Sequence, residues 1–445
     1  MNPLQAIAAW AAGPAVESLP ESGVALVKRA FLDTIAVTLL GSRLDAPRIA
    51  AKIELERGGR AQASLYGMRV RTDVLSAALV NGTSAHAELF DDNNAPMIAH
   101  PSAPLVTALL ALGEARGARG RDVLYAYAAG FEIGVKLGRM LNPALYEHGW
   151  HATRVLGILG TTAACGRLLA LSAERISAAL GIAASMASGI RQNFGTMTMA
   201  LHAGLTARDA VHAALLAQRG YGADPAALDG KYGFFALFAG QQPELLPLGE
   251  PFELLASGII FKPYPCGAPT HAAVDAALAL RGRLGGDLSR INRITCFVHP
   301  WNEMTLREEE PRDALQAKVN LRYCIAAALR HGELGFRQFT ETALSDPVVT
   351  DLRRRIDVQA SRKLPDNGEF PAELRITTTA GEELVERRDV PPGGSTRPLG
   401  EDQVIAKLRA CAAERLGAPT IERVIELVRG LEHLESVAPL CTALQ

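Results

Sequence analysis

The chain has 445 residues and a formal net charge of −1, with 48% hydrophobic and 5% aromatic residues. This charge gives no attraction to nucleic acid or to an anionic membrane, and no apolar run reaches the roughly 20 residues that a membrane helix needs. The six cysteines stand singly without zinc-type spacing and no signal peptide is recognised, so we expect reduced thiols in the cytoplasm.

The first 260 residues have the apolar spacing of helices. Residues 1–60 predict two helices, the second continuing to Gly41. Residues 63–71 fit a short hairpin or loop, after which Thr72 or Asp73 would cap a helix running towards Asp92. The remaining helices are expected at about 101–117, 121–141, 172–187 and 205–219.

The pattern changes near residue 266. Alternating, β-branched stretches at 291–299 and 356–361, and two more between 372 and 390, predict strands, and 313–332 predicts one helix. Residues 401–445 return to helical spacing. We therefore predict a mainly α protein: a helical domain of residues 1–267, completed by 399–445, with an inserted α+β lid domain at 268–398.

The stretch NGTSAHAELFDDNNAPMIAHPSAP at 81–104 is the most polar part of the helical region. It places His86, Asp91, Asp92, Asn93 and His100 within fifteen residues, between two apolar helices. Such groups are costly to bury without partners. The stretch is either one wall of a polar active site or a polar loop between core helices.

Further candidate groups lie outside this stretch: His151, Arg191, His202, Lys262 and His271. Histidine exchanges protons near neutral pH, and the cationic side chains hold carboxylates. The set suits abstraction of a proton next to a carboxylate, with His100 or His151 as the acid or base. Arg191 and Lys262 would bind the substrate, with His86, Asn93, His202 and His271 in support.

Asp91 and Asp92 would orient the histidines. His86 and His202 could equally be structural histidines. Because the histidines and aspartates lack compact ligand spacing, no metal and no cofactor are expected.

Five stretches together resemble the MmgE/PrpD family: 81–104, YEHGWHAT (146–153), SGIRQNFGTMTMALHAG (188–204), FKPYPCGAPTH (261–271) and DALQAKVNLRYCIAAAL (313–329). The resemblance implies a cofactor-independent lyase, similar to 2-methylcitrate dehydratase, acting on a small di- or tricarboxylate. It also implies a homodimer and a site in the cleft between the two domains. The catalytic role of His100 rests mostly on this resemblance.

Two positions depart from the family pattern. Leu89 stands where members often have Asp, and Met199 where they often have Lys. Loss of one acid and one base together keeps the charge balance but changes the chemistry offered to a substrate. Two alternatives therefore stay open: an epimerase of a small dicarboxylate, or a carboxylate-binding relative without turnover.

Overall fold

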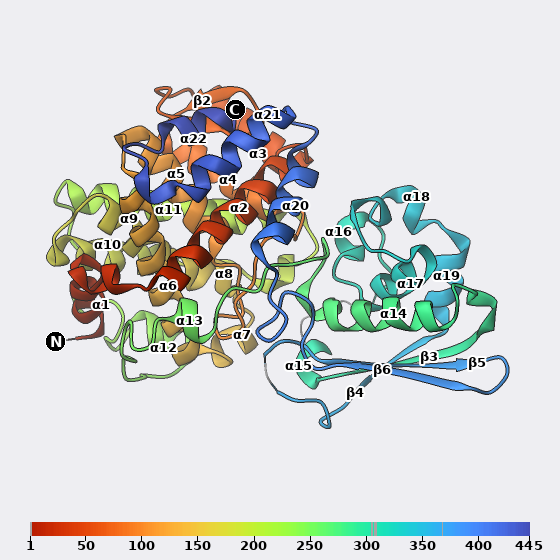
Figure 1. Cartoon of the computed structure of the whole chain (residues 1–445). Coiled ribbons are helices and arrows are strands. Elements are labelled where there is room, and N and C mark those ends of the chain that lie inside the picture. The colour runs from red at the N-terminus through yellow and green to blue at the C-terminus, as the bar shows by residue number, and fades with distance from the viewer. Residues whose placement is uncertain (1, 304–305, 307–308, 367) are drawn as a thin grey trace. The chain divides into compact units, whose positions relative to one another are not determined.

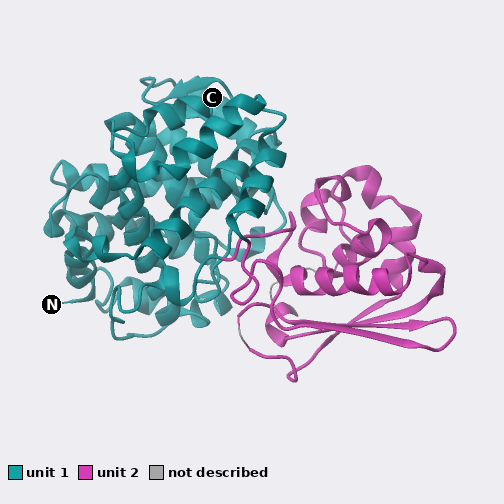
Figure 2. Ribbon diagram, in the orientation of Figure 1, with its two compact units in different colours: residues 1–259, 400–445 teal, residues 260–399 magenta. Residues whose placement is uncertain are grey.

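The computed structural model describes residues 2–303, 306, 309–366 and 368–445 (Figure 1). They form a mainly α protein with little β structure, as the sequence predicts. The chain divides into two compact units, residues 1–259 with 400–445 (unit 1) and residues 260–399 (unit 2), coloured separately in Figure 2. None of the described helices is both long enough and apolar enough to span a lipid bilayer.

In its described residues, unit 1 is helical apart from one antiparallel hairpin and two isolated β-bridges. Its first half contains α1 (Pro3–Ala12), α2 (Glu21–Gly41), α3 (Asp45–Arg57), β1 (Ala63–Leu65), β2 (Val70–Thr72), α4 (Val74–Ala87), α5 (Ser102–Arg116) and α6 (Gly120–Leu141). It continues through α7 (Ala144–Glu147), α8 (Ala152–Val155), α9 (Gly157–Leu168), α10 (Ala173–Met186), α11 (Met197–Gln218), α12 (Phe234–Ala239) and α13 (Glu253–Ala256). The chain returns to it with α20 (Glu401–Ala412), α21 (Ala418–Arg429) and α22 (Ala438–Ala443).

Three sequence predictions for unit 1 need correction. Residues 1–60 contain three α-helices, because α3 follows α2 after a short turn. Helix α4, capped by the Asp73 side chain, ends at Ala87, and Leu89 takes a left-handed φ of 54° before the acidic pair. Helix α11 begins at Met197, eight residues earlier than predicted, so His202 is a helical residue.

Unit 2 packs helices on a four-stranded sheet of order β4-β3-β5-β6. Its elements are α14 (His271–Arg283), β3 (Ile291–Val298), α15 (Pro300–Glu303), α16 (Ala314–Ala317), α17 (Leu321–His331), α18 (Glu341–Leu344), α19 (Pro347–Arg354), β4 (Ile356–Ala360), β5 (Ala372–Thr378) and β6 (Glu383–Arg388). Strand β3 runs parallel to β4 and antiparallel to β5.

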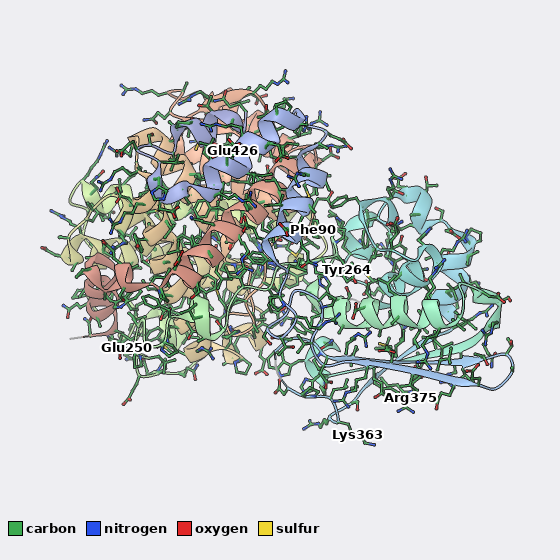
Figure 3. All side chains as sticks on the ribbon, viewed as in Figure 1. Phe90, Glu250, Tyr264, Lys363, Arg375 and Glu426 are labelled. Carbon is green, nitrogen blue, oxygen red and sulfur yellow. The ribbon has the colours of Figure 1, made fainter. Side chains whose placement is uncertain are left out.

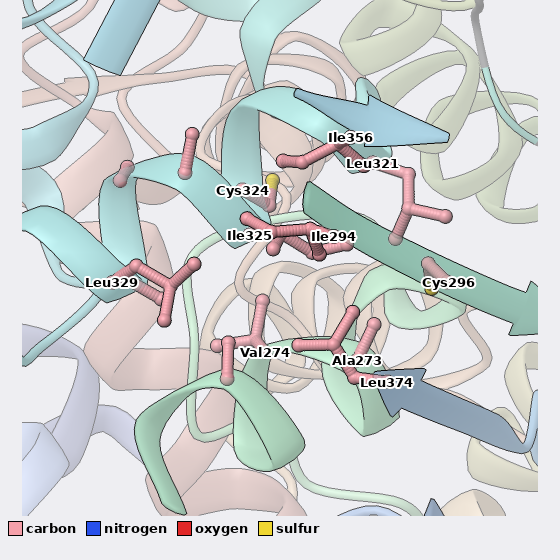
Figure 4. Packing of buried hydrophobic residues seen from close by; sticks show 14 of the residues in the cluster. Ala273, Val274, Ile294, Cys296, Leu321, Cys324, Ile325, Leu329, Ile356 and Leu374 are labelled. Carbon is pink, nitrogen blue, oxygen red and sulfur yellow. The ribbon is translucent and has the colours of Figure 1, made fainter. Parts of the chain in front are cut away.

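The core of unit 2 forms where α14 and α17 bury their alanine- and leucine-rich faces. Alternate residues of β5, including Leu374 and Ile376, are buried, as period-two patterning requires. Val274 of α14 and Ile325 of α17 belong to the same cluster (Figure 4). The single helix predicted at 313–332 is wrong, because the chain breaks before Asn320, whose side chain caps α17.

Candidate functional site

A close contact between two helices of unit 1 brings distant histidines together. On α4 and α11, Gly82 and Gly204 lie so near one another that a Cβ on Gly82 would come within 2.9 Å of the Gly204 Cα. Only glycine permits this approach of the backbones. His86 is one turn beyond Gly82 on α4, and His202 lies two residues before Gly204. The spacing of the motifs NGTSAH and LHAG thus decides where the histidines meet.

The Asp91 carboxylate connects two of the histidines. Its Oδ2 atom lies 2.8 Å from His86 Nδ1 and 3.5 Å from His100 Nδ1. The His100 Nδ1 atom is also 2.7 Å from the backbone oxygen of Asp92. Because a carbonyl oxygen only accepts hydrogen bonds, His100 must carry its proton on Nδ1. In the neutral ring, the Nε2 atom therefore holds the lone pair that can take a proton.

Accessibility separates His100 from the other members of the cluster. Its side chain is 18% exposed, whereas the side chains of His86 and Asp91 are fully buried. His151 and His202 are also buried. His100 is thus the histidine of this cluster that solvent, and so a substrate, can reach. Its backbone N–H donates to the Thr153 hydroxyl (3.1 Å), which ties it to α8.

His151 and His202 form a second pair of histidines, next to His86 and His100. Their Nδ1 atoms are 2.9 Å apart, so one ring donates to the other. Burial, together with His86 and His202, holds the pKa of His151 well below its usual range. Burial, with the nearby His86 and Arg154 charges, lowers the pKa of His202 to about 4. Both rings are therefore neutral at pH 7 and can relay or orient a proton.

The carboxyl group of Asp92 is held by Ser102. Its Oδ1 accepts from the Ser102 backbone N–H (3.2 Å), and its Oδ2 contacts the Ser102 hydroxyl, which lies 2.6 Å from the Tyr127 hydroxyl. Burial raises the pKa of Asp92 to about 8; the Ser102 hydrogen bonds oppose this rise, and the charges of Asp91 and Asp33 add to it. Asp92 thus orients His100 through its backbone oxygen.

Arg191, which begins a short 3-10 helix (Arg191–Asn193), and Asn93 belong to the same unit. A bridge between Trp150 and Ile190, with His151 N–H donating to Gly189 O (3.0 Å), sets the 149–151 and 189–191 segments side by side. The Arg191 guanidinium lies 3.8 Å above the Tyr146 ring and donates to its backbone oxygen (2.8 Å). Asn93 is 9% exposed.

Lys262 and His271 belong to unit 2. Lys262 is fully buried, so a solvated surface lysine is excluded. His271 Nε2 lies 3.2 Å from the backbone oxygen of Cys266 at the start of α14. Burial raises the pKa of Cys266, but the Cys324 hydrogen bond and the His271 charge bring it well below the usual value. The roles predicted for Lys262, His271 and the other proposed site residues remain predictions.

The sequence reasoning missed the buried groups that support these histidines. Arg154 lies behind His202 and donates to Asp209 Oδ2 at 2.5 Å. Ser102 and Tyr127 satisfy Asp92. Arg154 follows His151 by three residues, and Asp209 follows His202 by seven, so both lie about one or two helical turns away. This spacing from the two histidines could have pointed to Arg154 and Asp209 in the sequence.

His86, Asp91 and His100 are also the described residues whose ligand atoms come closest to metal spacing, all within 4.8 Å of one another. Both Nδ1 atoms already donate hydrogen bonds, to Asp91 and to the backbone oxygen of Asp92. A metal ion bound through either Nδ1 atom would have to replace these bonds, whereas one bound through an Nε2 atom would not. Metal independence therefore stays a prediction.

Together these groups form a candidate site in the helical unit. It contains one partly exposed imidazole, that of His100, and the three buried imidazoles of His86, His151 and His202. Two family models match the chain: the MmgE/PrpD N-terminal domain over residues 5–246 and the MmgE/PrpD C-terminal domain over residues 264–433. The chain belongs to the MmgE/PrpD family.

Curated relatives agree over nearly their whole length. The chain is 30% identical to the human cis-aconitate decarboxylase over 435 residues, which cover 94% of this chain and 89% of the relative. It is 29% identical to the mouse cis-aconitate decarboxylase (97% and 91%) and 26% identical to the Aspergillus terreus one (97% and 93%). With this family and these relatives, the chain is classed as an enzyme, a lyase.

Proposed function

We propose that this protein is a cofactor-independent lyase of a small polycarboxylate, with a tricarboxylate such as cis-aconitate as the first substrate to test. The observation that carries the proposal is the partly exposed His100 ring, whose Nδ1 atom donates to Asp92 O, so that Nε2 is the nitrogen that can exchange a proton. The relatives named as cis-aconitate decarboxylases support this substrate class. Dehydration of a 2-methylcitrate-like substrate is the second reaction to test.

The two reactions use His100 in opposite protonation states. In dehydration, neutral Nε2 takes the proton from the carbon next to a carboxylate, and the electron pair expels the β-hydroxyl group. In decarboxylation, carbon dioxide leaves and the electron pair of the broken C–C bond stays on the substrate carbon. Protonated His100 then gives that carbon a proton. Both reactions build negative charge on the remaining carboxylate. Arg191 and Lys262, the carboxylate-binding residues predicted from the sequence, would stabilise this charge.

Leu89 and Met199, the two apolar residues that depart from the family pattern, limit which substrates the site can bind. Leu89 is 3% exposed, and Met199 is 5% exposed on the same helix as His202. Neither can hold a proton or a charge. We propose that His100 performs the proton transfer without an acid at residue 89, and that the substrate has no charged group that needs a cation at residue 199.

The proposal extends to domain organisation. Unit 1 would be the helical domain built from both ends of the chain, and unit 2 the inserted α+β domain. Limited proteolysis tests this, since cleavage confined to residues near 260 and 399 is expected.

The activity test is a panel of di- and tricarboxylates incubated in deuterated water and followed by NMR. Decarboxylation yields a product lacking one carboxylate and carrying one deuterium; dehydration yields a new alkene; epimerisation yields deuterium exchange without elimination. Turnover that falls as pH rises supports decarboxylation, and turnover that rises supports dehydration. Substrate binding without any of these changes would refute the lyase proposal.

The matched variants are His100→Gln and His212→Gln. His212 is exposed on α11 and controls for the loss of an imidazole. His100→Gln is expected to lower kcat by roughly 100-fold or more while an inert analogue still binds. Equal activity of both variants would remove His100 from the mechanism.

A further inference from the structure

A lysine from the C-terminal part of the chain lies buried under the polar stretch. Lys407 of α20 has a side chain that is 6% exposed. Its Nζ atom is 2.6 Å from the backbone oxygen of Phe90, 2.7 Å from Asp33 Oδ1 and 3.7 Å from the centre of the Phe90 ring (Phe90 is labelled in Figure 3). One ammonium thus binds a carbonyl, a carboxylate and an aromatic face.

The segment that Lys407 holds is the one that orients the histidines. Phe90 lies between Leu89, whose left-handed φ of 54° is unfavourable for a leucine, and Asp91, whose carboxylate bonds His86. A strained turn persists only where its surroundings hold it. The hydrogen bond to Phe90 O and the cation–π contact with its ring fix the residue just before Asp91.

We propose that Lys407 is a positioning residue for the proton transfer at His100. It holds Phe90 so that the Asp91 carboxylate and the Asp92 backbone oxygen meet the two imidazole Nδ1 atoms. This inference rests on the proposed function, because it gives His100 the reacting atom. Nothing in the sequence pairs Lys407 with this stretch, since more than 300 residues separate them.

A purely structural role must be separated from this one. Lys407 also neutralises buried Asp33, and removal of one partner leaves an uncompensated charge. The informative variant therefore combines Lys407→Met with Asp33→Asn. It removes both charges, keeps the side-chain volumes close to the original, and deletes the donor to Phe90 O.

The expected result is a folded double variant whose kcat falls roughly 10- to 100-fold, with KM little changed, because the reacting groups are displaced. Lys407→Gln with Asp33→Asn keeps an N–H donor and is expected to recover part of the loss. The control is Lys136→Met with Glu132→Gln, two buried residues of α6. Glu253, the nearer partner of Lys136, keeps Arg139, and the control is expected to keep kcat.

A second readout needs no substrate. NMR of ¹⁵N-labelled histidines reports which ring nitrogen carries the proton. His100 is expected to be protonated on Nδ1 in the parent and to become a mixture of tautomers in the Lys407→Met, Asp33→Asn variant. If the parent turns over no carboxylate, the proposed function fails, yet the tautomer measurement still decides the role of Lys407.

Unchanged kcat together with an unchanged His100 tautomer in the folded Met variant would overturn the proposal. Should that variant not fold, the Gln variant replaces it. Its weaker donor predicts an intermediate loss of kcat and a partial tautomer shift, and parent-like values of both would overturn the proposal equally.

Discussion

Replacing Asp92 by asparagine is expected to make the stability of the protein less dependent on pH. The Asp92 carboxyl is buried, and its pKa is raised from 3.8 to about 8. Between these two values the native state keeps a proton that the unfolded state has lost. The free energy of unfolding therefore falls as pH rises through this window. The amide of the Asp92→Asn variant would mimic the protonated acid and carry no such dependence.

The size of this change in the free energy of unfolding follows from the pKa shift of Asp92. Each pKa unit corresponds to about 1.4 kcal/mol, so the whole window from 3.8 to about 8 amounts to about 6 kcal/mol. Between about pH 5 and about pH 7.5, the stability difference between the Asp92→Asn variant and the parent should grow by about 3 kcal/mol in favour of the variant. Other titrating groups are shared by both proteins and cancel in this difference.

The assay is urea unfolding of both proteins at several pH values, followed by circular dichroism. Asp402→Asn is the control, because it removes the same charge from an exposed residue of α20. Parallel stability profiles for the Asp92→Asn variant and the parent would refute the reasoning. They would show that Asp92 is ionised at neutral pH despite its burial.

Three further predictions concern other parts of unit 1 and the assembly. His202→Gln should weaken the loss of stability on acidification, because the pKa of His202 is lowered to about 4 and the native state resists its protonation below the usual 6.5; acid unfolding of variant and parent measures this. Gly82→Ala should lower the free energy of unfolding by about 1–3 kcal/mol, since its Cβ meets the backbone of α11, whereas Gly222→Ala, where that space is open, should cost little. The protein should be a homodimer in solution, and light scattering at micromolar concentration that gives a monomer mass would contradict this.

Helices and strands were predictable where a local pattern specifies them. The alternation at 291–299 became β3, and Pro101 and Ser172 lie at helix starts as predicted. The break at Asn320 was missed because the alanine-rich run on either side suits a helix. Asn before an apolar run is itself a helix-start signal, so a capping analysis could have found it.

The candidate site was predictable in its residue types and much less in its partners. An acid inside an apolar helix face, such as Asp33 before Gly41, is typical of a buried structural residue, and Asp33 is buried with an ion partner. That partner, Lys407, is more than 370 residues away, and no periodicity links the two. The meeting of His86 with His202 likewise depends on a helix crossing between Gly82 and Gly204, which is a property of packing rather than of local sequence.

The return of the chain to unit 1 through α20 has a consequence for biosynthesis. Residues 260–399 leave the ribosome before the segment that contains Lys407 and packs against α2. During that interval Asp33 lacks its ammonium partner and Phe90 lacks its donor, so the helical unit is incomplete while the residues of unit 2 are already available to fold. Nascent chains stalled shortly after residue 399 should therefore expose apolar surface of α2 and depend on chaperones more than the released protein does.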